Sequence, residues 1–133
     1  MKILIILLTL FISISNANAD WIFVKSSDDK SVDLYIDGES IQIINKDIRR
    51  YWSKSNLQES EVTKYGNYQS MRAFNEIDCK NKKFRGLSVS FYEKNDLLGK
   101  VISSRENENV KWSFMPPNSL GSIASDIICS IQK

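Results

Sequence analysis

Few residues in this sequence are of the types that perform enzyme chemistry. It contains two cysteines, Cys79 and Cys129, and no histidine. Histidine is the commonest general base and a common zinc ligand, so its absence removes Ser-His and Cys-His nucleophiles and most zinc sites. Carboxylate pairs at residues 28–29 and 59–61 lie in polar, turn-like segments, where charged side chains are normally solvated. The sequence therefore predicts a non-enzymatic protein without a catalytic residue, cofactor or metal.

The start of the chain changes how the two cysteines are interpreted. Lys2 is followed by an apolar run over residues 3–14 and by the small-residue motif Ala-Asn-Ala at residues 17–19. This order is typical of a secretory signal peptide, and the apolar run is shorter than the roughly 20 residues that span a bilayer. We expect cleavage after residue 19, so that residues 1–19 are the signal peptide. Because no cysteine follows the cleavage site directly, we expect no lipid anchor.

Export brings the chain into an oxidising compartment, in which a cysteine pair persists as a disulfide. A metal site or a redox pair is disfavoured, because the sequence has neither a CxxC motif nor a histidine. We therefore predict a disulfide between Cys79 and Cys129. In the entropic model, closing a loop of this length stabilises the fold by roughly 4 kcal/mol.

The charge balance argues against a nucleic-acid partner. The 18 basic and 16 acidic residues give a formal net charge of +2, and the two signs are mixed along the chain. A nucleic-acid-binding domain shows a basic stripe or a strongly basic balance instead. Residues 20–133 have the size of one domain with one core, and no second apolar stretch predicts a membrane span.

Aromatic, β-branched and alternating residues predict a mostly β protein. The expected strands are residues 21–25, 32–36, 41–44, 48–53, 68–79 and 84–92, with 100–104 as a further candidate. Polar turns separate them, and Asp37-Gly38 is a strong reversal signal that makes 41–44 the returning strand. The pattern predicts an antiparallel meander sheet of about six strands. The polar segment 54–67 is expected to be the longest and most mobile loop.

One helix is expected after Pro116 and Pro117, which stop any strand. Ser119 is suited to cap it, and apolar residues follow at helical spacing. They are Leu120, Ile123, Ala124, Ile127, Ile128 and Ile131. This stripe must pack on a sheet face, which makes the fold α+β. Cys129 lies nearly opposite the stripe on an ideal helix. Either the helix ends or distorts near Ile128, which we favour, or its angle brings the far side to Cys79.

Strand alternation divides the sheet into two faces. The face toward the helix is expected to carry Met71, Ile77, Leu87, Val89 and Phe91. The opposite face is expected to carry Arg49, Tyr51, Arg72, Phe74 and Tyr92, together with Phe84. Aromatic residues and arginine are enriched in protein interfaces, and no second helix is available to cover them. This set is a candidate partner-binding or self-association face, unless loops or sheet curvature shield the rings.

The order of several motifs resembles the surface-adhesin protein E family of Gram-negative bacteria. The motifs are Trp21, YIDGESI at 35–41, Trp52, EIDC at 76–79, FRGLSVSFY at 84–92, KWSFMPPNSLG at 111–121 and IIC at 127–129. The resemblance covers nearly all of residues 20–133. It implies an antiparallel sheet whose C-terminal helix is tethered by a disulfide. The best-known member of the family is an outer-membrane lipoprotein that binds host matrix and plasma proteins such as laminin, vitronectin and plasminogen.

The resemblance predicts an exported, non-enzymatic binding domain whose partner is a protein, either from the host matrix or plasma or a second copy of the chain. No ligand-contact motif can be carried over from the family. Because the lipid-attachment cysteine is missing after the signal, we expect a periplasmic or extracellular protein. The alternative is a periplasmic inhibitor or envelope accessory protein without host contact.

Overall fold

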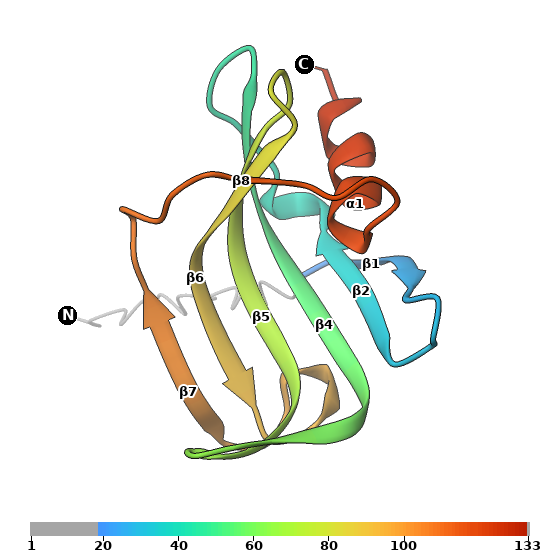
Figure 1. Ribbon diagram of the computed structural model, residues 1–133, viewed down its shortest axis with the longest axis vertical. Coiled ribbons are helices and arrows are strands. Elements are labelled where there is room, and N and C mark those ends of the chain that lie inside the picture. The colour runs from blue at the N-terminus through green and yellow to red at the C-terminus, as the bar shows by residue number, and fades with distance from the viewer. Residues whose placement is uncertain (1–18, 133) are drawn as a thin grey trace, which may run out of the picture.

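A computed structural model describes residues 19–132, which form one antiparallel sheet and one α-helix (Figure 1). The main strands are β1 (Trp21–Ser26), β2 (Val32–Asp37), β4 (Ile48–Thr63), β5 (Gly66–Asp78), β6 (Lys83–Tyr92) and β7 (Val101–Glu106). They lie side by side in that order. Two short strands, β3 (Gln42–Ile43) and β8 (Ser113–Phe114), pair with β4 and β6. The predicted mostly β fold is thus confirmed; the predicted signal peptide lies outside the described residues, except for Ala19.

The segment 54–67 was expected to be a mobile loop, and this prediction is wrong. Strand β4 runs through most of it, and β5 begins at Gly66. The polar side chains of this segment find partners inside the fold: Lys54 Nζ and Asn56 Nδ2 both donate to Asp96 Oδ1 at 2.8 Å. Asp96 belongs to a short 3-10 helix, η2 (Asn95–Leu97), far away in the sequence. Composition predicted a loop because partners so distant cannot be read from local sequence.

The segment 41–44 was expected to pair with the preceding strand, and this is also wrong. Only β3 is extended there, and it pairs with Arg49 and Arg50 of β4. A 3-10 turn, η1 (Gly38–Ser40), replaces the tight hairpin turn. The Asp37 carboxylate accepts the Glu39 N–H and caps this turn. Strand β2 therefore pairs with β4 instead of its neighbour in sequence.

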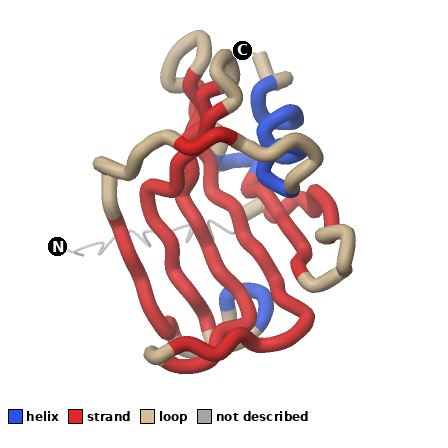
Figure 2. Tube along the Cα trace, in the orientation of Figure 1, coloured by secondary structure: helices blue, strands red, loops and turns tan. Residues whose placement is uncertain are grey.

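Helix α1 (Leu120–Cys129) begins where Ser119 caps it, as its Oγ accepts the Ser122 N–H. Figure 2 shows that α1 covers one corner of the sheet, not its whole surface. Ala124 and Ile128 are fully buried against β2, β4 and β5. The core consists of Leu34, Ile36, Tyr51, Ile77, Ala124 and Ile128. We call the sheet side that carries these residues the helix face and the opposite side the outer face.

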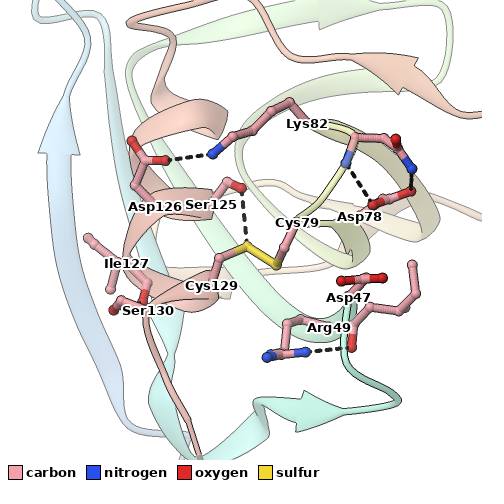
Figure 3. Close-up of a disulfide and its surroundings, with 12 residues drawn as sticks. Asp47, Arg49, Asp78, Cys79, Lys82, Ser125, Asp126, Ile127, Cys129 and Ser130 are labelled. Atoms are coloured by element: carbon pink, nitrogen blue, oxygen red, sulfur yellow. Dashed lines mark hydrogen bonds and ion pairs between the residues drawn. A yellow bond between two sulfur atoms is a disulfide. The ribbon is translucent and has the colours of Figure 1, made fainter.

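The disulfide between Cys79 and Cys129 joins the end of β5 to the last residue of α1 (Figure 3). The helix stops at Cys129, and the Ser130 N–H donates to the carbonyls of the final turn. Cys129 is therefore still helical, and the favoured interpretation, in which the helix ends or distorts near Ile128, is wrong. The buried side of α1 carries Ala124, Ser125 and Ile128, whereas Ile127 is 43% exposed, so the orientation of the helix brings Cys129 to Cys79. The bond spans 50 residues, so it links the middle of the sheet to the helix that covers its core.

Candidate functional site

The structure places the five predicted partner-binding residues on two different faces. In the β4–β5 ladder, Arg49 lies opposite Ile77, and Tyr51 lies opposite Asn75. Arg49 and Tyr51 therefore share the helix face with the core residue Ile77, and they are only 7% and 6% exposed. Their predicted place on the outer face is wrong. Alternation separated Arg49 and Tyr51 from their neighbours, but it could not decide which set the helix would cover.

Both buried residues serve the fold. The Arg49 Nη1 atom donates to the Asn45 carbonyl at 2.8 Å and to the Ile48 carbonyl at 3.2 Å, so it stabilises the turn before β4. Tyr51 is part of the core, and burial raises the pKa of its hydroxyl to about 12. Neither side chain is available to a partner.

A bulge in β6 places Phe84 on a different face from the one predicted. The register of the β5–β6 ladder shifts between Phe74 and Asn75, which leaves Leu87 without a directly opposed residue. Phe84 consequently pairs with Ile77 and lies on the helix face instead of the outer face. An extra residue reverses the alternation on one side of a bulge, and strict alternation therefore assigned Phe84 to the wrong face.

Arg72, Phe74 and Tyr92 lie on the outer face, where Phe74 contacts Trp52. Trp52 pairs with Phe74 across β4 and β5, and their ring centroids are 4.9 Å apart. The Arg72 guanidinium stacks 3.9 Å above the Trp52 ring. We call Trp52, Arg72 and Phe74 the aromatic–arginine patch. Trp52 was not among the predicted partner-binding residues, because Tyr51 of the alternate set was placed on the outer face instead. Its shared parity with Arg50 was the signal in the sequence that could have identified it.

Arg72 lacks a counter-charge in this patch. Within the described part of the chain it forms no ion pair, and its buried Nε atom has no hydrogen-bond acceptor. The residue directly opposite is Lys54, which is already paired with Asp96 at 2.8 Å. The outer face thus presents a stacked cation whose charge the protein itself does not neutralise.

Next to the patch, two arginines hold one buried carboxylate. Glu76, whose side chain is 4% exposed, receives Arg50 Nε and Arg85 Nη2 at 2.6 Å each. Burial raises the pKa of Glu76, but the hydrogen bonds from the two arginines outweigh it and leave the pKa below its ordinary value. Arg85 also lies with its guanidinium carbon 4.5 Å from the Trp112 ring centroid. This cluster orients Arg50 beside Trp52.

The patch and the cluster border a groove of about 450 Å³ on the outer face. Its lining residues are Arg50, Trp52, Phe74, Arg85, Leu87, Ser88, Glu106, Glu108 and Asn109. An aromatic floor with fixed cations on one side and carboxylates on the other suits recognition of a protein surface, in which apolar and charged groups alternate. No catalytic residue was predicted from the sequence. Residues 19–132 contain no cluster of three or more potential metal ligands.

Tyr92 lies farther along the outer face, opposite Ser70. Ser70 Oγ donates to the Lys94 carbonyl, and the Leu97 N–H donates to Ser70 Oγ, so the β6–β7 connection closes over this end. Because Arg72 lies opposite Ser90, Tyr92 is two residues along β6 from the level of Arg72 on the same face. In the described part of the chain, none of the helices has the length and apolar character needed to cross a membrane.

Comparison with known proteins connects this fold to one family. The family model described as surface-adhesin protein E matches residues 21–130. Two solved structures of protein E from Haemophilus influenzae are similar, each with a TM-score of 0.57. One is 21% identical and covers 81% of this chain and 83% of that chain. The other, from a non-typeable strain, is 22% identical and covers 87% of this chain and 79% of that chain.

The structural likeness at this identity supports the fold, and a search of curated proteins found no match. The family match spans β1 to α1 and includes both disulfide cysteines and the strands that carry the patch. The chain belongs to the surface-adhesin protein E family.

Proposed function

We propose that this chain is an exported, non-enzymatic binding domain that contacts a protein partner through the aromatic–arginine patch. The observation that carries the proposal is Arg72, which stacks on Trp52 without a carboxylate partner in the described chain. Family membership supports an adhesin-like role. The partner class is a host matrix or plasma protein; a second copy of the chain is the self-association form of the same contact.

A partner at this face is favoured because Arg72 lacks a counter-charge within residues 19–132 and the neighbouring aromatic rings are already held in place. Rigid aromatic rings and arginine contribute most of the binding energy at protein interfaces, because they bury large areas with little loss of conformational entropy. Trp52 and Phe74 are held against each other, and Arg50 is held by Glu76. A partner carboxylate placed on Arg72 would pair with a cation that is already oriented.

Export is part of the proposal, on the basis of the signal-peptide pattern at residues 1–19 and of the disulfide, which persists in oxidising compartments. The chain is then periplasmic or released from the cell. The first test is protease treatment of intact cells, with the culture medium assayed in parallel. Digestion or release supports contact with a host partner. Full protection until the outer membrane is opened contradicts it and favours a periplasmic inhibitor or envelope accessory protein.

The second test addresses the patch directly. The double variant Arg72→Gln/Phe74→Ala should lose binding to immobilised laminin, vitronectin or plasminogen, and should also lose any dimer seen by analytical ultracentrifugation. The matched control is Lys111→Gln/Phe114→Ala, which removes an exposed cation and an exposed ring outside the patch. Retained binding and self-association in the patch variant, with lost stability instead, would refute the proposed interface.

A further inference from the structure

The tip of the β4–β5 hairpin forms a second hollow at the end of the sheet where β6 ends and β7 begins. The tip packs on β7, where the Ile102 methyl groups lie 3.5 Å from the position of a Cβ at Gly66, which has a φ of +132°. Thr63 Oγ1 donates to the Gly66 carbonyl and closes the turn. Between the tip, β6 and β7 lies a hollow of about 670 Å³. It is lined by Thr63, Lys64, Tyr65, Tyr68, Phe91, Ile102, Ser103, Ser104 and Arg105.

The hollow extends along the free edge of β7. Four consecutive residues of this strand, 102–105, line it. Ile102 is the extra residue of a β-bulge, whereas Ser103, Ser104 and Arg105 pair in regular register with β6. Ser104 therefore points to the face opposite that of its two neighbours, and a hollow over one face alone would not reach all three residues. Strand β7 is the last in the sheet order, and its outer side has no partner strand in the described chain. The hollow therefore opens onto an unpaired strand edge.

The edge offers backbone hydrogen bonds. The Asn107 N–H donates to the Leu87 carbonyl, and hydrogen-bonded pairs alternate along an antiparallel ladder. Ser104, which lies opposite Ser90, is then a non-hydrogen-bonded position, and the two hydroxyl oxygens are 2.8 Å apart there. At such a position the backbone N–H and C=O point away from β6. Ser104 and Glu106 thus direct these groups toward the open side.

The lining combines an apolar floor with positive charge. Tyr68 and Phe91 meet edge to face with ring centroids 4.8 Å apart, and the Arg105 guanidinium lies 5.8 Å from the Phe91 ring. Lys64 lies over Tyr65. Within residues 19–132 neither cation forms an ion pair, and no carboxylate lines the hollow. The nearby Glu61 accepts the Tyr68 hydroxyl hydrogen bond.

We propose that this hollow and the β7 edge bind an extended acidic peptide segment of a partner protein, which adds a strand to β7 and inserts one aromatic or branched apolar side chain. Addition of a strand to a sheet edge obtains affinity from backbone hydrogen bonds and specificity from side-chain pockets. Here the pocket is apolar, and Lys64 and Arg105 select acidic flanks. The site lies apart from the aromatic–arginine patch, so either site can fail in experiments without the other.

The test uses a fluorescent, end-blocked peptide of sequence EDFDVE and fluorescence anisotropy on the folded domain. The charge-reversed peptide KKFKVK should bind at least tenfold more weakly at low salt. The double variant Lys64→Gln/Arg105→Gln should weaken EDFDVE binding by about fivefold, as expected for two solvent-exposed ion pairs. The matched control Lys46→Gln/Lys80→Gln removes two exposed lysines at the opposite end and should leave binding unchanged. Equal binding of both peptides, or no effect of the Lys64/Arg105 variant, would overturn the proposal.

Backbone pairing is tested with two N-methylated forms of EDFDVE, each methylated on alternate residues. Only one set of N–H groups can face β7, so one form should bind at least tenfold more weakly than the other. A second readout is Ser104→Pro, which removes an outward N–H and should weaken the unmodified peptide as well. If both methylated forms bind like the parent while 2-naphthoate competes, the hollow accepts a small aromatic anion only, and strand addition is refuted.

Discussion

Arg49 and Arg72 lie on opposite faces of the same sheet and show how differently one residue type is used. Arg49 is buried on the helix face and donates to carbonyls of its own turn. Arg72 is partly exposed on the outer face, stacks on Trp52 and forms no ion pair within residues 19–132. The Nε atoms of both arginines lack an acceptor in the described chain, so this atom does not distinguish them. The first arginine stabilises the fold, whereas the second is the one that we propose contacts a partner. The helix face thus carries the arginine that stabilises the fold, and the outer face carries the one proposed for partner binding.

The same division applies to the other interactions. The helix face is held by apolar burial and by the disulfide, both of which stabilise the folded state. The outer face is held by stacked rings and by the ion pairs of Glu76. We therefore expect substitutions on the helix face to reduce stability and substitutions in the aromatic–arginine patch to reduce partner binding.

The largest effect is expected from the disulfide. The double variant Cys79→Ala/Cys129→Ala should lower the free energy of unfolding by about 4 kcal/mol, because the 50-residue loop is no longer constrained in the unfolded chain. Urea denaturation of the variant and of the oxidised protein measures this difference. An unchanged midpoint would show that the helix packs on the sheet without help from the bond.

The core beneath the helix gives the next effect. Ile128 is 0% exposed, so Ile128→Ala should cost about 3 kcal/mol through lost burial and the cavity that remains. Its neighbour Ile127 is 43% exposed, and Ile127→Ala should cost less than about 1 kcal/mol. Thermal and chemical denaturation compare the two. Similar costs would mean that α1 is not anchored through Ile128.

Glu76, on the outer face, should make the stability of the fold depend on pH. Glu76→Gln should cost about 2 kcal/mol at neutral pH, because two arginines lose a buried charged acceptor. The pKa of Glu76 is lowered in the folded state, so its stabilisation is complete above the ordinary value of 4.5 and is lost as pH falls below it. The variant should therefore lose stability less steeply than wild type below about pH 5.

Denaturation midpoints measured from neutral to acid pH test this expectation. Glu93→Gln, which removes an exposed 3.7 Å ion pair with Lys100, is the control and should change stability by less than about 0.5 kcal/mol. Parallel pH profiles for wild type and Glu76→Gln would contradict the role of Glu76.

The two arginines themselves provide the smallest and most direct comparison. Arg49→Gln should cost about 2 kcal/mol, because buried carbonyls lose their donor, and it should leave partner binding intact. Arg72→Gln should cost only about 0.5 to 1 kcal/mol, the value of an exposed cation–π contact, and should weaken partner binding. Stability by denaturation and binding by surface plasmon resonance are measured on the same samples. Loss of binding in Arg49→Gln together with the larger loss of stability in Arg72→Gln would contradict the roles assigned to the two faces.

Much of the fold could be predicted from local patterns. The helix, its Ser119 cap and the strands near residues 21–25, 32–36, 68–79 and 84–92 follow from alternation and helical spacing. The disulfide follows from two cysteines in a chain that begins with a signal-peptide pattern and contains no histidine. The long polar half of β4 could not be predicted, because its buried polar residues Lys54 and Asn56 depend on Asp96, about 40 residues away.

The candidate site, too, could be predicted only in part from the sequence. By itself the sequence determined which residues alternate, that Cys79 and Cys129 can pair, and that arginine and aromatic side chains lie close together in β4 and β5. Only the tertiary structure decided that Tyr51 is buried, that Trp52 faces outward, and that a bulge moves Phe84 to the helix face. Alternation defines two sets of side chains per strand, but the buried set depends on register, bulges and the position of the helix.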